Sequence, residues 1–253
     1  MALSLQADTV TAAVLIIGDE ILSGRTQDQN GNYIARYLAA VGIELLEIRV
    51  VPDIEDEIVA AVDALRHRYT YVFTTGGIGS THDDITADAM GRALGVEVLE
   101  DPRAIAMLLE RLRPDQLNDA RRRMARIPKG AELIENSVSK APGFMIGNVI
   151  VMAGIPMVMQ AMLDAVAPRL KCGARVLVET VAAGAIPEGR YSEGLAAIAA
   201  AEPEVSIGSY PQFSSEGVRN EIVLRARDAA RLAAAAHSVR GLLAELSSDR
   251  ALG

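Results

Sequence analysis

The segment Thr74–Thr86, with the sequence TTGGIGSTHDDIT, concentrates residue types that can bind a phosphorylated ligand. Glycine lacks a Cβ, so this loop can turn sharply and let a ligand approach its backbone. Its amides, followed by the start of an expected helix, favour an anion such as phosphate. The candidate binding and metal-ligating residues of the loop are Gly76, Gly77, Gly79, Ser80, Thr81, Asp83 and Asp84. A tight turn followed by an acidic helix cap is the alternative interpretation.

Carboxylates also follow two other expected strands, at Asp19-Glu20 and at Asp53. Ligands of open α/β sheets bind at the carboxyl ends of the strands, so these groups are expected beside the glycine loop. Carboxylates near a phosphate favour a hard divalent cation such as Mg²⁺, which takes oxygen ligands. The alternatives are that Asp19 and Glu20 cap a helix and that Asp53 only ends a strand.

Further candidates lie after the loop. Gly154 and Pro156 follow another expected strand and share the same edge of the sheet. Lys140 is either a phosphate clamp or an exposed surface lysine. His82 is expected to be a hydrogen-bonding bystander, and the run Arg121–Arg123 is expected to be a solvated helix face.

Alternating strand-like and helix-like patterns predict the scaffold that positions these residues. Short β-branched runs indicate buried parallel strands, and apolar residues at helical spacing indicate amphipathic helices. The expected strands are 12–17, 43–51 and 71–75, and the expected helices are 30–41, 54–65, 86–94 and 157–170. A charged helical segment over 102–127, split by Pro114, and a hairpin over 144–152, turning at Gly147-Asn148, complete this part.

The pattern changes after residue 170. Strands are expected at 176–181, 205–210 and 219–225, helices at 191–201 and 229–246, and a loop at 211–217. The predicted fold class is therefore α/β, a three-layer and mostly parallel sheet over residues 1–170, with a small α+β domain over residues 171–253.

Composition limits the classes of function. The formal net charge of -8 disfavours sequence-independent nucleic-acid binding, which depends on Lys and Arg. The single cysteine excludes an internal disulfide. The N-terminal residues do not have the pattern of a signal peptide, and no apolar run has membrane-spanning length. A cytoplasmic protein that contacts neither nucleic acid nor membrane is expected.

Two motifs resemble those of a known family. The run Gly18–Gly24, with sequence GDEILSG, and the run Thr74–Thr86 look like the molybdopterin-binding (MoaB/Mog-like) domain. The resemblance is strongest to the N-terminal part of CinA-type proteins and covers residues 12–170. The tail, with Gly208–Pro211, resembles the small domain that follows in CinA-type proteins.

The resemblance implies a pterin- or nucleotide-phosphate site, with Asp53 and Asp84 as the catalytic aspartates. In the CinA-like branch it implies a hydrolase: a pyrophosphatase that uses Mg²⁺, Mn²⁺ or Co²⁺ on ADP-ribose- or FAD-like diphosphates. The alternatives are molybdopterin adenylyl transfer, in molybdenum cofactor biosynthesis, and a non-catalytic pterin- or nucleotide-binding protein. Val158, where CinA-type proteins commonly carry Glu, favours the last alternative. The resemblance also implies a homo-oligomer.

Overall fold

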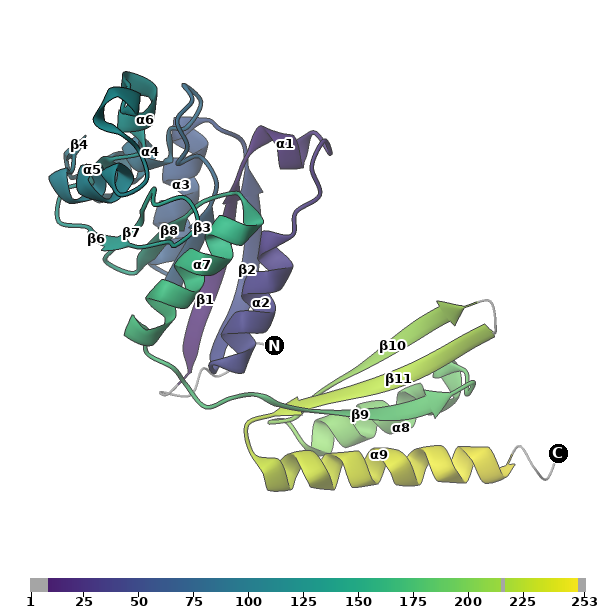
Figure 1. The fold of residues 1–253 in the computed structure, drawn as a ribbon. Coiled ribbons are helices and arrows are strands. Elements are labelled where there is room, and N and C mark those ends of the chain that lie inside the picture. The colour runs from purple at the N-terminus through teal and green to yellow at the C-terminus, as the bar shows by residue number, and fades with distance from the viewer. Residues whose placement is uncertain (1–8, 215–216, 250–253) are drawn as a thin grey trace. The chain divides into compact units, whose positions relative to one another are not determined.

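A computed structural model shows two compact units, Met1–Gly173 and Ala174–Gly253, each with its own core (Figure 1). The structure describes residues 9–214 and 217–249. Most of the N-terminal start that was compared with a signal peptide therefore lies outside the described residues. The last four residues of the expected small domain do so too.

The first unit is built on one six-stranded sheet with the order β2-β1-β3-β8-β7-β6. The strands β2, β1, β3 and β8 are parallel, and β7 and β6 are antiparallel to their neighbours. This confirms the mostly parallel sheet expected from the alternating pattern. The strands are β1 (Val10–Ile17), β2 (Ile43–Val51), β3 (Tyr71–Thr75), β6 (Glu132–Ile134), β7 (Gly143–Ile146) and β8 (Val149–Met152).

Alternate residues of β1 enter two different cores, which makes the unit a three-layer fold. Leu15 packs with α3 (Glu55–Arg66), α4 (Thr86–Leu94) and α5 (Pro102–Leu109) on one face of the sheet. Val14 packs with α2 (Asn30–Ala40) and α7 (Pro156–Val166) on the other (Figure 1). Successive strand side chains point to opposite faces, so a buried strand needs apolar residues throughout.

Two short elements continue this scaffold. The helix α1 (Asp19–Leu22) begins directly after β1, and the 3-10 helix η2 (Ala167–Arg169) ends the segment expected as one helix to residue 170. The hairpin β7–β8 turns at Gly147, which has a left-handed φ of 58°, as its Gly-Asn turn predicts.

The expected charged helix over 102–127 is wrong in part. Here α5 ends at Leu109, η1 (Pro114–Gln116) and α6 (Asp119–Arg123) are short, and a strand pair flanks them. That pair joins β4 (Val98–Glu100) to β5 (Arg126–Pro128). Both strands have only three residues, too few to show a period in the sequence.

The second unit has a three-stranded antiparallel sheet in the order β10-β11-β9. Its elements are β9 (Leu177–Gly184), α8 (Glu188–Ala201), β10 (Ser206–Ser214), β11 (Gly217–Ala226) and α9 (Ala229–Asp249). The expected loop over 211–217 is wrong, because the strands continue to Ser214 and from Gly217. Residues 215 and 216 lie outside the described residues.

Within the described residues, no helix has both the length and the apolarity needed to cross a lipid bilayer.

Candidate active site at the carboxyl end of the sheet

The glycine loop after β3 is fixed by close backbone contacts. Gly76 has φ of 106°, and a Cβ there would lie 2.1 Å from the carbonyl oxygen of Ile17. Gly77 has φ of 64°, and a Cβ there would lie 2.2 Å from Oγ1 of Thr86. The Thr86 hydroxyl donates to the Gly76 carbonyl at 3.0 Å, and its amide donates to the Gly77 carbonyl. Only glycine fits both positions, so the sequence GG at this point is a geometric requirement.

Asp84 closes the other end of the loop. Its Oδ2 accepts hydrogen bonds from the Thr81 amide at 2.8 Å and from the Thr81 hydroxyl at 2.6 Å. A Cβ on Gly79 would lie 2.6 Å from the same oxygen. Ser80 lies between these residues and is partly exposed. A single oxygen of the Asp84 carboxylate therefore holds this end of the loop in shape.

Asp53 links two strand ends at the carboxyl edge of the sheet, the rim that also carries Asp19, Glu20 and Asp83. Its Oδ2 accepts the Asp19 amide at 2.9 Å, which joins the ends of β1 and β2. Burial raises the pKa of the Asp53 carboxyl, and the negative charges of Asp19, Glu20 and Asp83 raise it further. The Asp19 hydrogen bond opposes these effects. Asp53, Asp19, Glu20 and Asp83 thus lie near enough to repel one another, as the strand-end pattern predicts.

The two remaining rim carboxylates differ in exposure. Glu20 folds back over Gly18, where an added Cβ would lie 2.6 Å from Oε2 of Glu20. Asp83 is exposed, and hydrogen bonding to Thr81 lowers the pKa of its carboxyl. His82, 3.9 Å from Asp83, has a side chain that is 96% exposed.

Gly154 and Pro156 lie where α7 begins beside the glycine loop. A Cβ on Gly154 would lie 3.3 Å from Cα of Gly76, and Pro156 is in the first turn of α7. The Gly154 carbonyl accepts Nδ2 of Asn30 at 2.8 Å. Asn30 is only 5% exposed, and its Oδ1 has no hydrogen-bond partner among the described residues.

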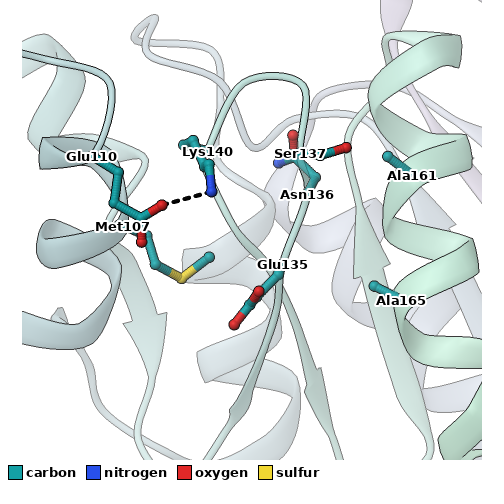
Figure 2. A pocket seen from close by; sticks show the side chains of 8 residues that line it. All are labelled: Met107, Glu110, Glu135, Asn136, Ser137, Lys140, Ala161 and Ala165. Carbon is teal, nitrogen blue, oxygen red and sulfur yellow. Dashed lines mark ion pairs between the residues drawn. The ribbon is translucent and has the colours of Figure 1, made fainter.

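Lys140 belongs to a different part of the surface. It lies in a cavity of about 260 Å³ between α5 and α7, and its Nζ pairs with Glu110 at 2.6 Å (Figure 2). This cavity shares no lining residue with the small hollow beside the glycine loop. Lys140 is thus already neutralised, and the structure does not bring it to the loop.

Two cations beside the glycine loop were missed by the sequence reasoning. Arg123 and Arg126 line the hollow that also contains Gly77, Gly79 and Asp84. Arg126 pairs with Asp88 at 2.6 Å, whereas Nε of Arg123 is buried without a hydrogen-bond partner in the described part of the chain. The run Arg121–Arg123 was the available signal, and its interpretation as a solvated face is wrong for Arg123.

A divalent cation fits the chemistry of the rim, with one restriction. Carboxylate oxygens are its preferred ligands, and the mutual repulsion around Asp53 would be relieved by a positive charge. Among the described residues, however, no group of three or more His, Cys, Asp or Glu side chains could hold a metal ion by itself. Mg²⁺ is commonly held by one or two carboxylates together with phosphate oxygens of the substrate, and this arrangement suits the rim.

Val158 does not lie on this rim. It is 5% exposed and packs in the core between the sheet and α7. Because Val158 faces that core and not the rim, its position gives no argument against catalysis at the rim. Ile155 and Met157 are the exposed residues at the start of α7, at 64% and 63%.

The fold and the strand-end site define a molybdopterin-binding-like α/β protein, and comparison with known proteins identifies its family. The family described as "Probable molybdopterin binding domain" matches residues 13–172, and "FAD synthase, middle domain" matches residues 177–251. The chain belongs to the molybdopterin-binding domain family, as its two motifs predicted.

Individual relatives support this family assignment. A CinA-like protein of Desulfosudis oleivorans is 36% identical over 216 residues, covering 80% of this chain and 52% of the relative. An Archaeoglobus fulgidus protein is 31% identical over 199 residues, covering 79% of this chain and 85% of the relative. The crystal structure of CinA from Thermoplasma acidophilum, a protein described as of unknown function, superposes with a TM-score of 0.61. It is 33% identical to this chain and covers 64% of it and 99% of the CinA chain. The chain thus spans about half the length of the CinA-like relative.

Proposed function

We propose that this protein is a divalent-metal-dependent nucleotide pyrophosphatase that cleaves ADP-ribose- or FAD-like diphosphates. One observation carries the proposal: the carboxylates of Asp19, Glu20 and Asp83 converge on Asp53, at the same end of the sheet as the glycine loop. A phosphate and a cation together would satisfy both features. The family match and the FAD synthase middle domain match support the same class of ligand.

The loop, Arg123 and the carboxylates have separate roles in the proposed reaction. The amides of Gly77 and Gly79 bind the diphosphate, and Arg123 offers it a positive charge. The Gly76 amide already donates to the Met152 carbonyl, so Gly76 contributes the turn of the loop and not a donor. Asp19, Glu20, Asp83 and Asp84 are the candidate ligands that would hold the metal together with phosphate oxygens of the substrate. The bound metal would polarise the phosphoryl group.

Proton transfer falls to Asp53. Its Oδ2 is occupied by the Asp19 amide, so Oδ1 is the oxygen that accepts a proton from the attacking water. A raised pKa makes this carboxylate a stronger base than an ordinary aspartate. Water adds to phosphorus, the bridging P–O bond breaks, and the products are AMP and the second phosphate monoester.

A second candidate is molybdopterin adenylyl transfer, which the match of residues 13–172 to a molybdopterin-binding family favours. It uses the same cradle with a phosphate in place of water as nucleophile. A non-catalytic binding protein is the third.

The test measures release of AMP from ADP-ribose and FAD with Mg²⁺, Mn²⁺ and Co²⁺ in turn. Asp84→Ala should abolish release while leaving the circular dichroism spectrum unchanged. Asp115→Ala, which removes an exposed carboxylate paired with Arg113 away from the rim, is the matched control and should retain activity. Full activity in Asp84→Ala would refute the assignment.

Two further results separate the alternatives. Release of pyrophosphate only when ATP and molybdopterin are both present would establish adenylyl transfer. Binding of a nucleotide or pterin without any turnover would establish a binding protein.

A further inference from the structure

Exposed apolar side chains gather at the edge of the sheet that carries the candidate active site. Among the described residues of the first unit, the four most exposed large apolar side chains are those of Ile155, Met157, Leu22 and Ile54, at 64%, 63%, 55% and 54%. Every other large apolar side chain in that described part is at most 49% exposed. Exposed apolar groups beside polar ones are typical of a binding surface.

These side chains form two pairs that follow different parallel strands. In the first pair, Ile54 follows β2 and Leu22 lies in α1, which follows β1. In the second pair, Ile155 and Met157 follow β8, at the start of α7 (Figure 1). The sheet order β2-β1-β3-β8 puts the glycine loop, which follows β3, between the two pairs.

Close contacts connect each pair to the polar centre of the rim. Asp53, the residue before Ile54, accepts the Asp19 amide at 2.9 Å. Gly154, the residue before Ile155, lies so close to the glycine loop that an added Cβ would be 3.3 Å from Cα of Gly76. The rim therefore has a charged and phosphate-friendly centre with an apolar pair on each side.

The separation of the two pairs suits a molecule with two rings. The strands β2 and β8 are three strand spacings apart, about 14 Å. An extended dinucleotide separates its two bases by a similar length, because a ribose and a phosphate stand on each side of its bridging oxygen. The apolar, charged and apolar parts of the rim have the same order as the parts of such a molecule.

The charged centre disfavours a protein surface as the occupant. Burial and the neighbouring carboxylates already raise the pKa of Asp53, and a protein laid across both apolar pairs would bury this group further. Burying a charge without a counter-ion costs stability, and the cores of protein interfaces are depleted of charged residues. A diphosphate with a bound metal ion brings charges for the centre and rings for both pairs.

We propose that the rim selects dinucleotides, which are diphosphates with a base at each end, by holding one base against Leu22 and Ile54 and the other against Ile155 and Met157. The inference rests on the proposed function, because it uses the same cradle for the diphosphate. The four side chains are then specificity-determining residues. They favour a dinucleotide over ADP-ribose, which carries a base at one end only.

Two probes that differ by one base test this selection. Diadenosine diphosphate has an adenine where ADP-ribose has a hydroxyl group, and the two molecules are otherwise the same. The wild-type chain should release AMP from diadenosine diphosphate with a kcat/KM about 30-fold above that for ADP-ribose, since the second base is taken out of water. Calorimetry on Asp53→Asn, in which turnover should be slow, measures whether Kd shows the same preference.

Two double variants in the Asp53→Asn background remove one apolar pair each. Leu22→Ser with Ile54→Ser, and Ile155→Ser with Met157→Ser, should each weaken binding of diadenosine diphosphate about 30-fold, because this probe uses both pairs. The four side chains are more than half exposed, so the fold should tolerate these changes, which circular dichroism checks.

Leu46→Ser is the matched control and should leave the Kd unchanged. Leu46 is an apolar residue that is 43% exposed, and it precedes Asp53 by seven residues along β2. In an extended strand this separation is about 20 Å, so Leu46 is remote from the rim.

The proposal is overturned if the wild-type chain treats the two probes equally. It is also overturned if either folded double variant keeps its affinity for diadenosine diphosphate, as expected of apolar groups that cover another protein. The proposed function fails separately. A preference in Kd without AMP release refutes the pyrophosphatase and supports this inference, whereas AMP release without the preference does the reverse. A chain that binds neither probe refutes both.

Discussion

The carboxylates of the rim differ in their partners from the carboxylates of the flanking helices α4 and α5. Asp88 pairs with Arg126, and Asp101 pairs with Arg103, both at 2.6 Å. Asp53 accepts only a backbone amide, and no ion pair with lysine or arginine joins it within the described residues. A charge that is partly buried without a counter-ion costs stability, so its retention is typical of a ligand site.

The pKa shifts have opposite directions in the two regions. Burial and the charge of Asp19 raise the pKa of Asp53, whereas hydrogen bonds from Arg103 lower the pKa of Asp101. Ionisation of Asp53 therefore opposes folding, and ionisation of Asp101 favours it. The Asp101 carboxylate thus stabilises the fold, whereas the rim retains a charge on Asp53 that a ligand would neutralise.

The largest expected effect comes from breaking the backbone that holds the rim together. Gly76→Ala combines a φ of 106° with a contact of 2.1 Å to a backbone oxygen, which cannot move aside. We expect a loss of about 3 kcal/mol in the free energy of unfolding, measured by urea denaturation. Gly130→Ala is the control, because its φ is 87° but its surroundings are open. It should lose about 1 kcal/mol, and equal losses would show that the contact with β1 is unimportant.

Asp53→Asn tests the rim directly. It should lower AMP release about 100-fold by removing the proton acceptor. It should also increase stability at neutral pH, since it removes a charge whose ionisation opposes folding. The folded-state pKa is raised, so wild-type stability falls as the pH rises through it, and the gain in Asp53→Asn appears only above the ordinary aspartate pKa of 3.8. Urea denaturation at several pH values measures this gain, and a loss of stability at neutral pH would contradict the comparison.

Asp101→Ala tests the flank and should have the opposite sign. Asp101 caps α5 by accepting the Arg103 amide at 2.8 Å, so its loss should cost about 1–2 kcal/mol of unfolding free energy. The folded-state pKa is lowered, so the contribution is present above the ordinary pKa of 3.8 and disappears as the pH falls through the folded value. AMP release should be unchanged. Asp101→Asn keeps the cap and should lose less, and an equal loss would assign the effect to the ion pair.

The sequence predicts the central sheet and its helices better than it predicts the segment 95–142, and the reason is physical. The central strands and helices have clear periods and apolar faces, so their order and the edge that gathers Asp19, Asp53 and the glycine loop were predictable from the sequence. The segment 95–142 folds through three-residue strands and short helices that have no detectable period. Arg123 reaches the hollow from α6 in this segment, and tertiary contacts alone place it there.

Contacts of single side chains could not be predicted from the sequence either. The Nδ2 of Asn30 donates to the carbonyl of Gly154, 124 residues away. Lys140 was a candidate phosphate clamp, yet Glu110 pairs with it across the cavity of Figure 2. In both cases the partner is distant in the chain, and local pattern carries no information about it.

Thr81→Val has the smallest expected effect and tests how Asp84 shapes the loop. It removes the hydroxyl that donates to Oδ2 of Asp84 at 2.6 Å but retains the Thr81 amide, which donates at 2.8 Å. One hydrogen bond to a charged acceptor is lost and one remains, so the carboxylate should loosen without leaving. A loss of about 1 kcal/mol corresponds to a roughly fivefold fall in kcat/KM for AMP release. Thr81→Ser keeps the hydroxyl and should be nearly wild-type. If Thr81→Val kept the wild-type kcat/KM, Asp84 would act independently of the hydroxyl that holds it.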